Sequence, residues 1–349
     1  MRKPETFPLN LHPTAIGSLP HRDPASACRA IAGVFPQVPI WPQLPQRSFR
    51  ENMYVQYSEG FPGVVLDSEA ERIYVDRSQD LDPGLERLYM AYLENDLDFA
   101  VISPDYAAGL AMLPAVLDDA PPPLAVKGQV TGPISWGLTV VDQNRRPTLY
   151  DEVLADAIAR HLRLKAAWQE RELGKLCSTV ITFVDEPYMS AFGSAFVAVS
   201  REQVVTLLEE VFSGIQGLKG VHCCGNTDWS ILLETSVDIL NLDAYHYAES
   251  LSLYPDAVRA FLRRGGVVAW GISPNEDDLI AQETVESLTE RLEAALGLLV
   301  KKGIPKDDLL AAMMITPSCG LGGMSVAAAE RVLALTAGVA AEMQRRYKR

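Results

Sequence analysis

The eight residues VITFVDEP, at positions 180–187, are the stretch that decides the fold. Their first five, Val180–Val184, form a short apolar and β-branched run typical of a buried strand, and the acidic pair Asp185-Glu186 ends it. Comparable runs recur along the chain, and longer segments with helical periodicity separate them. The eight predicted strands are Pro13–Gly17, Phe99–Ser103, Leu124–Val130, Val180–Asp185, Gly220–Cys224, Asp238–Asp243, Val267–Ile272 and Met313–Pro317.

Strands that alternate with helices indicate an α/β fold built round a parallel sheet. Eight such units predict a (β/α)8 TIM barrel that occupies the whole chain, residues 1–349, as a single domain. An open doubly wound sheet is the alternative, but the chain lacks the G-x-G-x-x-G fingerprint and the P-loop that would favour it. Residues 38–66 fit no βα unit and are interpreted as an insertion after the first strand, either a lid or an extra hairpin.

Apolar residues at spacings of three and four mark the predicted helices. One helical face joins Leu85, Leu88, Tyr89, Tyr92 and Leu93, and a second joins Leu288, Leu292, Ala295, Leu296 and Leu299. The last pattern, Val326–Ala341, is apolar nearly all round, which predicts a well-buried final helix.

The composition excludes several classes of protein. Against 31 lysines and arginines stand 45 aspartates and glutamates, and a net charge of −14 argues against nucleic acid or an anionic membrane surface as the main partner. The stretch Met1–Pro8 is polar, and no run of apolar residues is long enough to span a membrane. Five scattered cysteines are too few for a disulfide framework, so we expect reduced thiols in a cytoplasmic enzyme or binding protein.

The ends of the predicted strands carry candidate metal ligands. In an extended segment side chains alternate, so His222 and Cys224 point to the same face. Together with Cys319, after the eighth strand, they form a nitrogen and sulfur set suited to Zn²⁺, and Asp243 on the sixth strand could add a carboxylate oxygen. The alternative is that these cysteines are small buried hydrophobic residues, which is how we interpret Cys223.

Two carboxylates, Asp185 and Glu186, lie at the carboxyl end of the strand quoted above. Catalytic and binding groups of a barrel cluster at the carboxyl ends of its strands, which favours a functional role for this pair. The alternative is an ion-pair partner inside the mouth of the barrel.

Taken together, these motifs resemble those of a known family. They occur in the order found in the catalytic half of cobalamin-independent methionine synthase, and the resemblance covers nearly the whole chain. Uroporphyrinogen decarboxylase and corrinoid-dependent methyltransferases have related barrels. The matching segments are Thr14–Ser18, Thr131-Gly132-Pro133, Val184–Pro187, His222-x-Cys224, Ile239–Asp243 and Cys319-Gly320-Leu321.

The resemblance implies a methyltransferase that uses zinc to move a methyl group to a thiol such as homocysteine. By position, the implied zinc ligands are His222, Cys224, Asp243 and Cys319. The implied substrate-binding residues are Ile16, Ser18 and Asp185, with Asp185 taking the ammonium group of the amino acid.

The methyl donor is expected to differ from that of the family. The family has a histidine after the seventh strand that protonates the folate leaving group, whereas this chain reads Gly271-Ile272-Ser273-Pro274-Asn275 there. A folate nitrogen is a poor leaving group without a proton donor. We therefore expect a donor other than polyglutamyl folate, with a corrinoid on a partner protein as the candidate. Two alternatives are a lyase resembling uroporphyrinogen decarboxylase and a non-catalytic accessory protein that binds metal or thiol.

Overall fold

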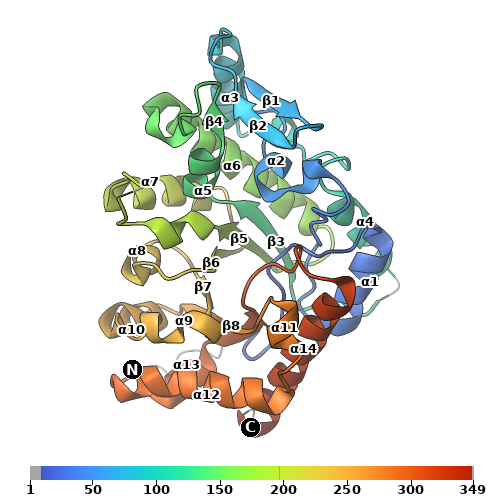
Figure 1. The fold of residues 1–349 in the computed structure, drawn as a ribbon, viewed down its shortest axis with the longest axis vertical. Helices are drawn as coiled ribbons and strands as arrows, with labels where there is room; N and C mark the ends of the chain where they lie inside the picture. The colour runs from blue at the N-terminus through green and yellow to red at the C-terminus, as the bar shows by residue number, and fades with distance from the viewer. Residues whose placement is uncertain (1–8, 119, 196, 348–349) are drawn as a thin grey trace.

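The computed structural model describes residues 9–118, 120–195 and 197–347, so the stretch Met1–Pro8 lies outside the described residues. Six parallel strands form a curled sheet in the order β3-β5-β6-β7-β8-β9. Figure 1 labels β3 and β5 to β8 along its curve. These strands are β3 (Val126–Thr131), β5 (Val180–Asp185), β6 (Leu218–Cys223), β7 (Ile239–Asp243), β8 (Val267–Ser273) and β9 (Met313–Pro317). Six of the predicted strands are confirmed, with ends that differ by a few residues at most.

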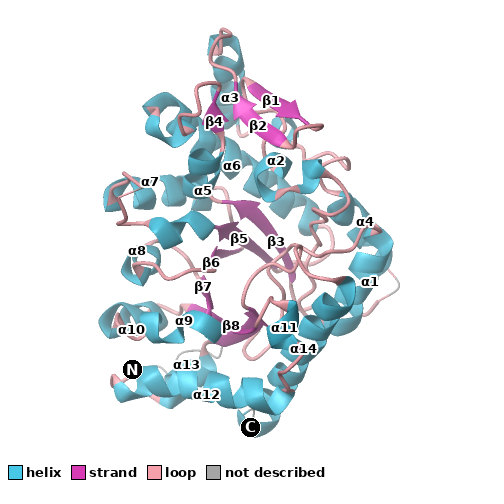
Figure 2. Cartoon of the chain, in the orientation of Figure 1, coloured by secondary structure: helices cyan, strands magenta, loops and turns pink. Residues whose placement is uncertain are grey.

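Helices surround the outer face of this sheet (Figure 2). Those named in Figure 1 along the curve are α1 (Pro24–Val34), α4 (Ala108–Leu117), α6 (Glu152–Leu173), α7 (Arg201–Phe212), α8 (Trp229–Glu234), α10 (Pro255–Arg263), α12 (Val285–Lys301) and α14 (Val326–Tyr347). Leu288, Leu292 and Leu299 of α12 are buried as predicted. No helix within the described residues is both long and apolar enough to cross a bilayer.

Two of the predicted helical faces need correction. In α3 (Asp82–Glu94) Leu88 is buried, but Leu93 is 74% exposed and is not part of the packed face. The helix α14 continues to Tyr347, with Val332, Val339 and Met343 buried and Val326 exposed at its start. The final helix is therefore longer than predicted and buries one side rather than its whole surface.

The predicted strand Phe99–Ser103 is wrong. Residues Leu97–Ala100 form a single 3₁₀ turn, which begins where the Asp96 side chain accepts a hydrogen bond from the N–H of Asp98. Residues 37–43 lie beside β3 instead. The N–H of Lys127 on β3 donates a hydrogen bond to the carbonyl of Pro39 at 2.9 Å. The apolar composition of residues 99–103 suggested a strand, but the Asp96 cap begins a 3₁₀ turn there instead.

Hydrogen bonds also link the two edges of the six-stranded sheet. The N–H of Thr14 donates to the carbonyl of Ile315 on β9 at 3.0 Å, and the N–H of Gln43 donates to the carbonyl of Gly17 at 3.0 Å. Isolated bridges pair Pro13 with Ile315, Ser18 with Gln43 and Ile40 with Lys127. The segments 11–19 and 37–43 therefore lie between β9 and β3.

The rest of the predicted insertion, residues 44–66, contains η1 (Phe49–Glu51) and α2 (Met53–Gln56) and leads into a hairpin. That hairpin, β1 (Val64–Asp67) and β2 (Arg72–Val75), joins β4 (Val141–Asp142) in a separate three-stranded sheet. The structure thus places residues 38–43 against β3, and residues 44–66 leave the sheet.

Side chains inside the curled sheet change from apolar to polar along the strands. Toward the amino ends they form one hydrophobic cluster, which includes Ile181, Phe183, Ile239, Val267, Ala269 and Met314. Two residues after Phe183 the same face of β5 carries Asp185, because side chains alternate along a strand. The apolar cluster fills one end of the interior, so the polar carboxyl ends face the other.

Candidate metal centre and adjoining cavity

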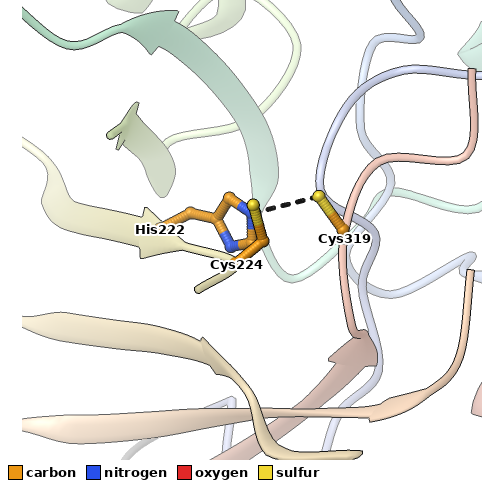
Figure 3. Close-up of side chains that lie close together, drawn as sticks. All are labelled: His222, Cys224 and Cys319. Atoms are coloured by element: carbon orange, nitrogen blue, oxygen red, sulfur yellow. Dashed lines mark hydrogen bonds between the residues drawn. The ribbon is translucent and has the colours of Figure 1, made fainter. Parts of the chain in front are cut away.

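Three predicted metal ligands meet at the carboxyl end of the sheet. His222 lies on β6, Cys224 directly follows that strand, and Cys319 follows β9 (Figure 3). One ligand atom from each lies within 4.8 Å of the other two, and Cys319 Sγ is 3.7 Å from His222 Nε2. A tetrahedral Zn²⁺ with usual bond lengths places such a sulfur and nitrogen about 3.5 Å apart. The three side chains therefore fit zinc after shifts of about 1 Å or less.

The electrostatics of these groups favour metal binding. Hydrogen bonds from Cys319 and His222 lower the pKa of Cys224 to about 4, although burial opposes this shift. The pKa of Cys319 is raised well above its usual value, because its thiol is bonded to Cys224 and is buried. Burial lowers the pKa of His222, but the Cys224 thiolate, the Asp185 charge and the hydrogen bond to Asn241 together outweigh it, and the net shift is upward. Cys224 is thus a thiolate at neutral pH, which is the form that binds metals.

Asp243, the fourth predicted ligand, is bonded elsewhere. Its Oδ1 accepts a hydrogen bond from the backbone N–H of His246 at 3.0 Å, and its Oδ2 lies 2.8 Å from Nδ1 of the same residue. Asp243 thereby caps α9 (Ala244–Leu251). Within the described part of the chain, the cluster able to share an ion holds His222, Cys224 and Cys319 without Asp243.

A cavity of about 370 Å³ opens beside this cluster. The predicted substrate-binding residues Ile16, Ser18 and Asp185 line it together with His222, Cys224 and Cys319. Another wall comes from residues 45–53, through Pro45, Gln46, Glu51, Asn52 and Met53. The structure therefore brings together six of the seven predicted site residues and adds part of the segment interpreted as an insertion.

Asp185 contributes an unpaired acceptor to this cavity. Its Oδ1 is buried and has no hydrogen-bond partner among the described residues. Burial raises the pKa of its carboxyl group to about 6, and the charges of His222 and Lys127 partly oppose that shift. A buried acceptor without a partner is rare in native proteins, so a positively charged ligand group that donates hydrogen bonds would suit this position.

Glu186, the neighbour of Asp185, has a structural role. Its carboxylate accepts hydrogen bonds from the backbone N–H groups of Ile134 and Ser135, at 2.9 and 2.8 Å, and from the Ser135 hydroxyl at 2.6 Å. It thus satisfies the amino end of α5 (Pro133–Thr139). Of the acidic pair singled out in the sequence, only Asp185 lines the cavity.

No lysine or arginine lies among the described residues that line the cavity. The buried Lys127 ammonium is close by, but it donates to the carbonyl of Ile16 and lies 4.2 Å from the centre of the Phe183 ring. Glu51 is neutralised by Arg47, whose Nη1 lies 2.9 Å from the carboxylate. The cavity is therefore suited to a cationic ligand group and poorly suited to several carboxylates or phosphates.

Sequence reasoning missed one polar residue of the centre, Asn241. Its side chain contacts the ring of His222, with Oδ1 2.5 Å from Nδ1. The signal was an asparagine between two leucines in a predicted buried strand, Leu240-Asn241-Leu242. A buried amide at such a position needs partners, but only the register of the strands identifies them.

Comparison with solved structures finds the same fold elsewhere. A B12-independent methionine synthase from Shewanella sp. W3-18-1, solved with selenomethionine, superposes with a TM-score of 0.57 over 97% of this chain and 98% of that chain, at 16% identity. A methyltransferase from Methanosarcina mazei gives 0.56 over 94% and 87%, at 12% identity. No protein-family model and no curated protein matches the sequence. At these identities the likeness shows the fold alone.

Proposed function

We propose that this protein is a zinc-dependent methyltransferase whose acceptor is a thiol such as homocysteine. The observation that carries the proposal is the convergence of His222, Cys224 and Cys319 on the cavity that Asp185 lines. The structural neighbours, a methionine synthase and a methyltransferase, support the same class of reaction.

Some residues of the cavity would bind the metal, and others would bind the substrate. His222, Cys224 and Cys319 would hold zinc, and catalytic zinc sites commonly have three protein ligands with the fourth position taken by water or substrate. Asp243 could become a ligand only by releasing His246, so we assign it to α9 instead. Zinc, when bound, would keep the acceptor thiol ionised at neutral pH.

Chain groups would orient the acceptor. We propose that Asp185 accepts hydrogen bonds from the substrate ammonium and that Ile16 and Ser18 contact the rest of the amino acid. In the transfer, the acceptor sulfur supplies the electron pair of the new S–CH₃ bond. The pair of the broken bond leaves with the donor.

The donor we propose is a corrinoid carried by a partner protein. Cationic side chains that would bind a polyglutamate tail do not line the cavity among the described residues, and residues 271–275 hold no histidine to protonate a folate nitrogen.

An assay with methylcobalamin and with methyl-folate, each with homocysteine, distinguishes the donors. Methionine formed from the corrinoid alone is the expected result, and formation from folate alone would contradict the donor assignment. Homocysteine binding without transfer from either donor would identify an accessory binding protein instead.

Metal analysis of purified protein tests the centre itself. We expect one zinc per chain in the native protein and in Cys177→Ser, a control at a half-buried thiol outside the cavity. Cys224→Ser and Cys319→Ser should lose the metal, because each removes a thiolate ligand. Native protein that holds no more zinc than these two variants would refute the proposal.

The lyase alternative is less well supported. A decarboxylase that acts on a substrate with several carboxylates needs basic side chains, and the cavity offers Asp185 instead.

We also propose that the sheet is a closed barrel. Residues 11–19 and 37–43 would be its first and second strands, and the chain would form one domain with residues 44–66 beside the mouth.

A further inference from the structure

Asn241 is a fully buried amide at the centre of the sheet. In the register of the strands it lies opposite His222 on β6 and opposite Ala269 on β8. Its relative exposure is 0%, so all its polar atoms must be satisfied by the protein.

The partners of Asn241 fix the orientation of its amide group. Nδ2 lies 2.8 Å from the carbonyl oxygen of Ala269 and 2.8 Å from the hydroxyl of Thr316. A backbone carbonyl can only accept, so the nitrogen of the amide must face it. The oxygen Oδ1 therefore faces His222, 2.5 Å from Nδ1.

This orientation determines which nitrogen of His222 carries the proton. An amide oxygen is an acceptor only, so Nδ1 of the ring must be the donor. In the neutral ring Nε2 then has the free lone pair, and Nε2 is the atom 3.7 Å from Cys319 Sγ. The tautomer required for metal binding is thus already selected by the protein.

The same amide joins the two parts of the centre. In the sheet order β6-β7-β8-β9, His222 lies on β6, whereas Cys319 follows β9. Asn241 on β7 bonds to His222, to the β8 backbone and to Thr316 on β9. One side chain therefore spans the distance between the two ligand-bearing strands.

We infer that Asn241 is a positioning residue of the metal centre, which holds His222 with Nε2 toward the ion and ties its strand to that of Cys319. The inference rests on the proposed function, since it assumes that the centre binds metal. Outer partners of a ligating histidine commonly contribute 10–100-fold to metal affinity.

The first test measures the ring directly. In metal-free protein labelled with ¹⁵N, a long-range ¹H–¹⁵N spectrum reports which nitrogen of His222 is protonated, and His222→Gln assigns its signals among the five histidines. At a pH above the raised pKa of His222, where the ring has lost the proton that it shares with Cys224, we expect a proton on Nδ1 and none on Nε2. A neutral ring protonated on Nε2 would overturn the inference, whether or not any variant folds.

The second test compares zinc affinity by competition with a chelator. Asn241→Leu, which removes the amide at similar volume, should bind zinc about 10–100-fold more weakly. Asn241→Asp keeps an acceptor for Nδ1–H but loses the two hydrogen bonds that Nδ2 donates, so it should recover only the part of the loss that comes from the orientation of His222. Asn10→Leu is the matched control, because Asn10 bonds to the N–H of Met313 at the amino end of β9 and should leave the affinity unchanged.

The outcomes separate this inference from the proposed function. Native affinity in Asn241→Leu would overturn the positioning role, and an equal loss in the leucine and aspartate variants would overturn the part of that role that acts through the His222 ring. Native protein that binds no zinc would refute the proposed function, while the ring measurement would still decide whether Asn241 selects the tautomer.

Discussion

Cys223 and Cys224 are neighbours in the sequence, but strand alternation gives them opposite surroundings. Cys223 is fully buried in the hydrophobic core, and burial raises its pKa. Cys224 lines the cavity, and hydrogen bonds from Cys319 and His222 lower its pKa to about 4. Two adjacent positions thus hold a thiol buried in the core and a reactive thiolate.

This contrast predicts selective alkylation of metal-free protein at pH 6. The thiolate is the reactive form, and at pH 6, above its lowered pKa, Cys224 is mostly ionised, whereas Cys223 is not. Peptide mapping by mass spectrometry after iodoacetamide treatment should find Cys224 modified first, with a rate that falls as the pH drops through about 4. Added zinc should protect it. Labelling that begins only above pH 8 would contradict this prediction.

Asp185 is the residue on which acceptor specificity depends in our proposal. Asp185→Asn should weaken homocysteine binding about 10–100-fold, because a hydrogen bond to a charged group contributes about 1.5–3 kcal/mol. Calorimetry with zinc-loaded protein measures this change. A thiol acid that lacks the amino group, 4-mercaptobutanoate, should bind both forms equally. An equal loss for both ligands would show that Asp185 acts on the site as a whole.

At the scale of elements, the sequence was most informative where strands are buried on both faces. Such strands appear as continuous apolar runs, and β5 and β9 were predicted with their observed ends. Residues 37–43 were missed because Pro39 and Pro42 have no N–H group and read as a loop. The apolar run at 99–103 was wrongly predicted as a strand. Its composition suits a strand, but the side chain of Asp96 caps a 3₁₀ turn that begins at Leu97.

For the candidate site, too, the sequence predicted some features and could not predict others. Alternation along one strand placed His222 and Cys224 on the same face, and the meeting of the carboxyl ends of parallel strands brought Cys319 to them, as the structure has it. The bonds of Asp243 depend on where α9 begins, and the partners of Asn241 depend on the register of four strands. Neither can be obtained from a single sequence.

Gly220 on β6 offers a test of how the elements pack. A Cβ at this position would lie 1.9 Å from the ring of Phe183, which fills the interior of the sheet. Gly220→Ala should therefore lower the free energy of unfolding by about 1–3 kcal/mol, as overpacking does. Urea unfolding measures the change.

Two variants control this experiment. Phe183→Leu combined with Gly220→Ala should recover part of the loss, because the smaller side chain leaves room. Gly297→Ala lies in α12 with nothing within 4 Å of the new Cβ, and it should raise stability by about 0.5–1 kcal/mol. Equal destabilisation by both glycine substitutions would rule out the clash as the cause.

At the scale of the whole molecule, the hydrogen bonds of residues 11–19 and 37–43 predict slow exchange of their amide protons. The N–H groups of Thr14, Trp41 and Gln43 are bonded to β9, β3 and Gly17 in turn. Hydrogen–deuterium exchange followed by mass spectrometry should find both segments about as protected as β3 and β9. Residues 68–71, the exposed turn between β1 and β2, serve as the fast reference. Exchange at the rate of that turn would show that the sheet stays open.

The distance along the chain between the proposed ligands has a consequence for how the protein would acquire its metal. His222 and Cys319 are separated by 97 positions, so a ribosome completes one part of the centre long before the other. A zinc ion that arrived in that interval would meet the imidazole of His222 and the sulfur of Cys224 on a nascent chain, without the thiolate of Cys319. Under our proposal, stable loading of zinc would have to wait until β9 has joined the sheet, and metal uptake would report completed folding.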